Sequence, residues 1–145
     1  MTLQNLLEIG QLKEHEATPE EIQTLLVAVR RNLADAQIEA VSLETRFDAA
    51  YKAIMQLAMI SLLANGFRPG SGAGHHMTMI QSLPKSIGLS RQRVVVLDAL
   101  RRKRNAADYM GSYVDQAATG ACLAEAQLLL TDVELWLRKY RSDLL

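Results

Sequence analysis

Residues 42–66 read SLETRFDAAYKAIMQLAMISLLANG, and this stretch decides the fold. Ser42 is a good N-cap for a helix, and Gly66 is the residue type that most often ends one. Between them the apolar side chains spread over nearly every side of a helix: Phe47, Ala50, Tyr51, Ile54, Leu57, Ala58, Met59, Leu62 and Leu63. A helix that is apolar on most sides needs neighbours on most sides. We therefore predict a central helix surrounded by others.

The segment before this stretch begins a second helix. Thr18-Pro19-Glu20-Glu21 combines an N-cap, a proline in the first turn and a capping box. Apolar residues follow at helical spacing: Ile22, Leu25, Leu26, Val29, Leu33 and Ala36. Closer to the N-terminus, residues 2–9 predict a short amphipathic helix that Gly10 closes.

The segments after the central stretch are also helical in pattern. A short helix begins at His75 or His76 and is disturbed by Pro84. A longer one runs from Arg91 to about Arg104, and the last covers about residues 115–141. No segment alternates as a half-buried strand does. We predict an all-α fold, an antiparallel helical bundle of about five to six helices.

Length and composition fit one globular domain. The chain has 145 residues, 49% of them apolar, which is enough to bury a core. We expect a single domain over residues 1–145, with a short N-terminal helix and linker in 1–17 and the bundle in 18–141. The 16 Lys and Arg balance the 16 Asp and Glu, so the whole molecule has no strong field for nucleic acid or membrane.

Cysteine content and hydropathy exclude several kinds of site and of cellular location. Cys122 is the only cysteine, which excludes a disulfide framework within the chain and a cysteine-based zinc site. No signal-like segment opens the chain, and no uninterrupted apolar run approaches the about 20 residues of a membrane span. We expect a cytoplasmic protein without a membrane segment, and we expect neither a metal nor a cofactor.

The overall charge balance hides one basic run. Residues 91–104 hold six basic side chains and one acidic one, Asp98. On a helix, Arg101, Arg102 and Lys103 fan out toward solvent, where cations also suit the C-terminal end of the helix dipole. Arg101 and Lys103 are therefore candidates for binding an anionic ligand.

Arg104 differs from its neighbours in the direction it faces. In a helix it falls on the same side as Val96, Leu97 and Leu100, the stripe expected to face the core. An arginine there needs a partner, a wet cleft or a ligand. One alternative is structural, because Asp108 lies one turn on and pairs with Arg104 if the helix continues.

His75 and His76 follow the glycine-rich loop 68–74. Adjacent helical residues point about 100 degrees apart, so the pair does not readily chelate one ion. The loop resembles an anion cradle, but it lacks a preceding strand and a Gly-Lys-Ser/Thr ending, so a surface loop is the favoured interpretation. The two histidines remain candidate acid–base groups.

A further alternative is a DNA-binding turn. Ile87–Val94 resembles the turn of a helix-turn-helix, whose second helix would then lie in the major groove. Pro84 interrupts the preceding helix, and Val94, Val95 and Val96 are too apolar to lie exposed over a groove.

Arg104 and Tyr109 stand late in an all-helical chain, with four residues between them, the first of which is Asn105. This arrangement resembles the motif of the HEPN superfamily, in which an Arg and a polar neighbour are followed, after a short spacer, by a His. The resemblance covers most of residues 18–141 in helix order. It implies a helical bundle, a cleft at a homodimer interface, and either metal-independent ribonuclease chemistry or RNA and nucleotide binding.

Carried onto this sequence, Arg104 takes the position of the motif Arg, Asn105 that of the polar neighbour, and Tyr109 that of the His. Tyrosine has an unperturbed pKa of about 10 and is a poor general base near neutral pH. The resemblance therefore implies a catalytically degenerate member, an RNA- or nucleotide-associated component of a toxin–antitoxin or stress-response system. Its expected partners are a second copy, an RNA or nucleotide, and an antitoxin or nucleotidyltransferase-type protein.

Two alternatives stay open. The chain is an active metal-independent endoribonuclease if Arg104 works with His75 or His76 in place of Tyr109. It is a structural or protein-interaction module if Arg104 is locked to a carboxylate. Met55, Met59 and Leu63 are expected on an exposed face of the central helix, where they would suit a homodimer.

Overall fold

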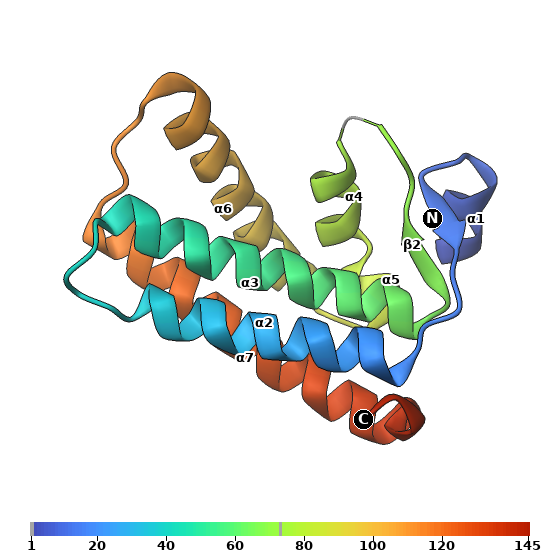
Figure 1. Cartoon of the computed structure of the whole chain (residues 1–145). Helices are drawn as coiled ribbons and strands as arrows, with labels where there is room; N and C mark the ends of the chain where they lie inside the picture. Colours follow the sequence, from blue (N-terminus) through green and yellow to red (C-terminus); the bar gives the residue numbers. More distant parts are fainter. Residues whose placement is uncertain (1, 73) are drawn as a thin grey trace.

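The computed structural model describes residues 2–72 and 74–145. Within them lie seven α-helices, two short strands and a final 3-10 turn (Figure 1). Their bounds are α1 Leu3–Glu8, β1 Leu12–Glu14, α2 Pro19–Ala36, α3 Leu43–Ala64, β2 Phe67–Pro69, α4 His75–Gln81, α5 Leu83–Ser86, α6 Arg91–Met110, α7 Gln116–Tyr140 and η1 Ser142–Leu144. The predicted all-α class is confirmed.

α3 is the central helix, as its sequence predicts. It packs against α2 and α7 along its length and also contacts β2, α4, α5 and α6. α2 runs antiparallel to both α3 and α7 (Figure 1). α4 and α6 lie on the side of α3 that faces away from α2. Thirteen of the 22 residues of α3 are buried, so its apolar sides are covered by neighbours on several sides.

The helix starts follow the local sequence. Thr18 and Glu21 form the predicted capping box, and the Ser42 and Ser90 hydroxyls accept backbone N–H groups in the first turns of α3 and α6. These side chains satisfy backbone donors that otherwise have no partner at a helix N-terminus. α7 begins at Gln116 behind the cap Asp115, within a residue of the expected start.

Two short strands correct the prediction that no strand is present. β1 and β2 pair antiparallel, with Leu12 opposite Pro69 and Glu14 opposite Phe67. Three residues are too few to show the alternation by which strands are recognised. A Cβ on Gly70 would lie 2.5 Å from the Gly10 carbonyl oxygen, so the two segments approach closely at a position where only glycine fits.

Two helix boundaries also differ from expectation. Pro84 divides the expected short helix into α4 and the single turn α5, which brings the number of helices to seven. α6 continues past Arg104 to Met110, where Gly111 ends it at φ +67°. Because α6 is continuous, Arg104 and Tyr109 point about 140 degrees apart and do not converge.

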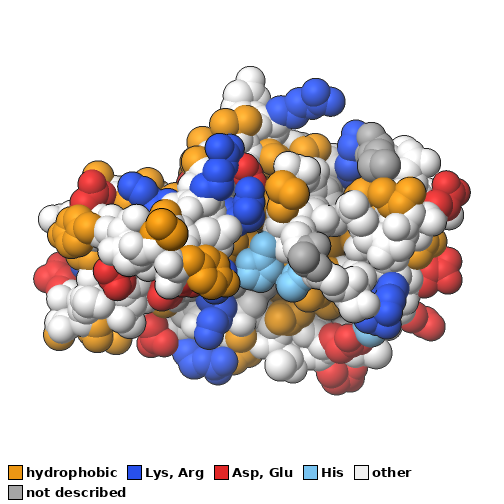
Figure 2. All heavy atoms as spheres, turned by 90° about the horizontal axis from the view of Figure 1, so that it is seen from above, with side chains coloured by type: hydrophobic (Ala, Val, Ile, Leu, Met, Phe, Trp, Pro, Cys, Tyr) orange, Lys and Arg blue, Asp and Glu red, His pale blue; other side chains and the backbone are white. Residues whose placement is uncertain are grey.

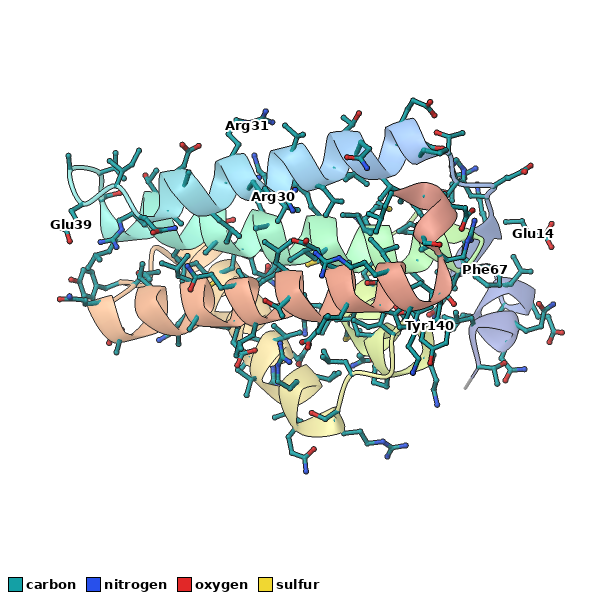
Figure 3. All side chains as sticks on the ribbon, turned by 90° about the horizontal axis from the view of Figure 1, so that it is seen from below. Glu14, Arg30, Arg31, Glu39, Phe67 and Tyr140 are labelled. Carbon is teal, nitrogen blue, oxygen red and sulfur yellow. The ribbon has the colours of Figure 1, made fainter. Side chains whose placement is uncertain are left out.

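Ion pairs fasten the helices at their margins. Arg30 Nη2 lies 2.9 Å from Glu134 Oε1 and connects α2 to α7. Figure 3 shows Arg30 on the side of α2 that faces α7, whereas Arg31 points away from the bundle. Arg93 connects α6 to α7, with Nε 3.0 Å from Glu125 Oε2 and Nη1 2.5 Å from Asp132 Oδ2.

α3 also has the length and mean hydropathy of a membrane-spanning helix. In the fold, 72% of its most apolar 18-residue window is buried against the rest of the protein. A central helix of a bundle has the same composition, because it too is surrounded by apolar neighbours.

Candidate functional site

Arg104 lies at the edge of the core. It follows Leu97 and Leu100 along one side of α6, and both leucines are buried. Val96 was expected on this side but is 41% exposed. The Arg104 side chain is 30% exposed, and its Nε lies 2.8 Å from Asp108 Oδ2, one turn on. The arginine therefore faces a wet boundary between helices rather than a dry interior.

Tyr51 of α3 connects Arg104 to a histidine. The guanidinium carbon of Arg104 lies 5.5 Å from the centroid of the Tyr51 ring, within the range of a cation–π contact. The Tyr51 hydroxyl is 3.3 Å from His76 Nδ1 on α4. Tyr51 itself is only 3% exposed, and burial raises its pKa to about 12. The phenol is therefore neutral at physiological pH and able to donate a hydrogen bond.

The pKa of His76 is lowered from its ordinary value. Burial is the largest cause, and the positive charges of His75, Arg104 and Arg101 act in the same direction. A histidine with a lowered pKa is mostly neutral near pH 7, so one ring nitrogen is free to accept a proton or a hydrogen bond. The His75 ring stands edge-on to it, with the ring centroids 4.9 Å apart.

These side chains line one open pocket of about 500 Å³, here called the α3–α4–α6 pocket. Its walls come from α3, α4 and α6, with one residue from α2: Leu25, Asp48, Tyr51, Lys52, Met55, Gln56, Met59, His75, His76, Met79 and Arg104. Figure 2 looks onto this side of the molecule and shows histidine side chains at the middle of the face, with Lys and Arg side chains beside them.

Asp48 is the acidic wall of the pocket. Burial raises its pKa, and the nearby charge of Asp108 raises it further, while Arg104 opposes both. Arg104 therefore lies in the field of two carboxylates, Asp48 and Asp108. A ligand phosphate must compete with them for the guanidinium.

The other predicted site residues lie around this pocket or away from it. Asn105 is half-buried on α6 and does not line the pocket. Arg101 is held by Asp98, with Nε 2.8 Å from Oδ1, yet it is close enough to lower the pKa of His76. Lys103 is exposed to solvent. Tyr109 is 77% exposed and lies outside the pocket.

The glycine-rich loop leads into α4, and none of its described residues lines the α3–α4–α6 pocket. His75 Nδ1 lies 3.2 Å from the Gly72 carbonyl oxygen, which ties the first turn of α4 to the loop. The loop also lines a small separate hollow of about 150 Å³ with Gly10 and Gln11. Ala73 lies outside the described residues.

In the part of the chain that the structure describes, no group of three or more His, Cys, Asp or Glu side chains is arranged to hold a metal ion. The pocket combines guanidinium, ammonium, imidazole and phenol groups with the carboxyl group of Asp48. The first four of these groups bind anionic oxygens and transfer protons without a metal.

Sequence reasoning missed the central member of the site. Tyr51 was counted among the apolar residues of α3, although its hydroxyl needs a partner when it is buried. Met55, Met59 and Leu63 were expected on an exposed face, but Met55 and Leu63 are buried and Met59 is half-buried. α4 and β2 contact α3, and Met55 and Met59 line the pocket between these elements, which the sequence pattern alone does not reveal.

The start of α6 is poorly suited to reading DNA. α5, which would be the first helix of a helix-turn-helix, is a single turn. Arg93, in the first turn of α6, is bound to Glu125 and Asp132 of α7. A side chain held in this way is not available to a base edge.

A scan against protein-family models finds no match for the chain, and a search of the curated proteins finds none either.

Proposed function

We propose that this chain is a HEPN-like protein that binds RNA or a nucleotide in the α3–α4–α6 pocket. The observation that carries the proposal is the position of Tyr51, which contacts both the Arg104 guanidinium and the His76 imidazole. In this proposal, Arg104 and Lys52 attract a phosphate, while His76 and Tyr51 donate or accept hydrogen bonds beside it. Arginine suits this task because its fork of donors matches two phosphate oxygens.

The position of Tyr109 supports a catalytically degenerate protein. It stands where the resembled motif has its histidine, and it points to solvent about 140 degrees away from Arg104. On this proposal the chain works as a binding component of a toxin–antitoxin or stress-response system in the cytoplasm. A second copy of the chain and an antitoxin or nucleotidyltransferase-type protein are its proposed partners.

The location of His76 favours a second candidate function, metal-independent RNA cleavage. A neutral imidazole is a competent general base for a ribose 2′-hydroxyl, and the neighbouring Arg104 is placed to stabilise charge that develops on the phosphate. In this candidate, His76 replaces the histidine that the motif lacks at Tyr109, and His75 is its neighbour in proton transfer.

The structural alternative has weaker support. Arg104 and Asp108 form an ion pair, but both belong to α6 and about a third of each side chain is exposed. Pairs of this kind contribute only about 0.3–0.5 kcal/mol. They stabilise one turn of a helix and do not join helices to each other. The pair therefore gives no strong structural reason for an arginine at this position.

A binding measurement tests the proposal. Short single-stranded RNA labelled with a fluorophore is titrated with wild type, Arg104→Ala and Arg31→Ala, and the anisotropy is recorded at two salt concentrations. Arg31→Ala is the matched control, because it removes the same charge from an exposed helical position that points away from the bundle. We expect Arg104→Ala to weaken binding by at least about tenfold and Arg31→Ala to leave it nearly unchanged. Equal affinities for all three proteins would refute the proposal.

An RNA cleavage assay in EDTA separates the two candidates. Wild type, His76→Gln and Arg104→Ala are purified in the same way and incubated with RNA. Cleavage by wild type that both variants lose supports the ribonuclease. Binding without cleavage supports the degenerate component, and equal trace cleavage in all three proteins indicates a contaminating nuclease.

A further inference from the structure

The α3–α4–α6 pocket has two chemically different ends. On α3 its lining residues run from Asp48 to Met59 along one face, at helical spacing. Eleven residue steps along an α-helix correspond to about 16 Å. The pocket is therefore elongated along α3, and its two ends face different parts of a bound molecule.

The end near the start of α3 is charged. Arg104 contacts the ring of Tyr51, and its charge opposes the raised pKa of Asp48, so it lies over this end. Lys52 lies one turn after Asp48 on the same wall. Two cations, beside one carboxylate whose pKa is raised, suit an anionic group that approaches from solvent.

The other end is apolar. Met55 and Met59 of α3 and Met79 of α4 line it, together with Leu25 of α2. His75 lies at this end, because it also lines a neighbouring hollow with Met59 and Leu63. Unbranched thioether side chains are polarisable and adapt their shape, so they pack well against flat aromatic rings. Pockets that combine an apolar floor with a few polar groups are typical of small-molecule sites.

We infer that this pocket holds a single nucleotide unit, with its phosphate at Arg104 and Lys52 and its base against Met55, Met59 and Met79. This inference rests on the proposed function and deepens it by assigning the base its own part of the site. Tyr51 lies at the charged end, and it and His76, which contact each other, are placed beside the phosphate and the sugar. A free nucleoside monophosphate and the terminal nucleotide of an RNA share this chemistry.

Calorimetry with three ligands tests whether the base is bound. Wild type is titrated with AMP, with ribose 5-phosphate, which lacks the base, and with adenosine, which lacks the phosphate. We expect AMP to bind at least about tenfold more tightly than either fragment, because burial of a base adds apolar area to the phosphate contact. Equal affinities for AMP and ribose 5-phosphate would overturn the inference while leaving phosphate binding, and so the proposed function, intact.

Variants of Met59 locate the base. Met59 is half-buried, so its replacement disturbs the core less than that of Met55 or Met79. Met59→Ser should lower AMP affinity close to that of ribose 5-phosphate and leave ribose 5-phosphate binding unchanged. Met59→Leu retains the apolar surface and should retain AMP binding, which controls for a general loss of folding. Unchanged AMP affinity in Met59→Ser would overturn the assignment of the base to this end.

Two further arms complete the test. Arg104→Ala should lose binding of both AMP and ribose 5-phosphate. If wild type binds neither of these ligands and no short RNA, the proposed function itself is refuted. Competition between AMP and a short RNA with a terminal phosphate then identifies the source of the nucleotide. Tighter binding of the RNA assigns the pocket to a chain end, and equal or weaker binding assigns it to the free nucleotide.

Discussion

α3 and α6 are both long helices that line the same pocket, yet they are held in opposite ways. α3 buries thirteen of its 22 residues, whereas α6 buries two of its 20, Leu97 and Leu100. The first is fixed by hydrophobic burial, and the second by two buried leucines, by the partly buried Val94 and Ala107, and by the ion pairs of Arg93 with α7. The difference indicates where a ligand site can form, because side chains that do not pack in the core are available to contact a ligand.

The attachment of α6 is polar at its first turn. Arg93 contacts two carboxylates of α7. Its Nη2 atom is buried and has no hydrogen-bond partner among the described residues. A buried donor without a partner lowers stability. α6 is therefore less firmly held than α3, and the following experiments measure how large that difference is.

The largest effect is expected from the centre of α3. Leu57 is fully buried, and Leu57→Ala should lower the free energy of unfolding by about 2–5 kcal/mol, since it removes apolar contacts and leaves a cavity. Val95→Ala on α6 is the control, because Val95 is 66% exposed and should change stability by less than about 0.5 kcal/mol. Urea denaturation measures both. Similar losses in the two variants would remove the contrast between the helices.

A smaller effect is expected at the junction of α6 and α7. Arg93→Ala leaves Glu125 and Asp132 without their common cation and should destabilise the fold by roughly 1–2 kcal/mol. Arg91→Ala, two residues earlier on the exposed side of α6, should have little effect. Thermal and urea unfolding of the two variants test this. A neutral Arg93→Ala would mean that the apolar contacts alone hold α6.

Arg104→Ala should lower the free energy of unfolding by no more than about 1.5 kcal/mol, because its pair with Asp108 lies within one helix and is partly exposed, and its cation–π contact with Tyr51 adds only about 0.5–1 kcal/mol. The same variant should lose RNA binding, as proposed above. Unfolding curves and anisotropy on the same samples measure both quantities. A loss of several kcal/mol would show that the arginine is a structural element and would weaken the argument for a ligand.

The smallest effect concerns pH. Because the pKa of His76 is lowered in the folded protein, the unfolded chain binds a proton first as pH falls below the ordinary value of about 6.5. The contribution of His76 to stability is therefore full above this pH and falls as pH decreases toward its folded-state pKa. His76→Gln should show a shallower decline between pH 7 and pH 5. Urea titrations at several pH values measure the slopes, and parallel slopes would contradict this prediction.

Local sequence predicted the helices well. The capping box at Thr18, the cap at Ser42 and the all-round apolar pattern of residues 42–66 are local features, and each has the predicted structure. The missed elements are those whose formation depends on distant contacts. β1 pairs with β2 across more than fifty residues, and neither strand has a pattern of its own.

The candidate site was predicted in part. Arg104, His75 and His76 were singled out, and the structure brings them to one pocket, whereas Tyr109 points elsewhere. The motif spacing around Tyr109 depends on where α6 ends, and that end was expected about six residues too early. The sequence does not distinguish Tyr51 from the core residues of α3, because it falls within the same apolar pattern.

The sequence by itself determined the helical class, the helix starts and the central place of α3, because capping and hydrophobic period act within a few turns of the chain. Only the tertiary structure decided which face of α3 stays open and that Tyr51 lies between Arg104 and His76. Those three residues come from α3, α6 and α4, and their meeting depends on how separate helices pack. The physical reason is that packing angles depend on all the contacting side chains together, whereas a helix depends mainly on its neighbours in sequence.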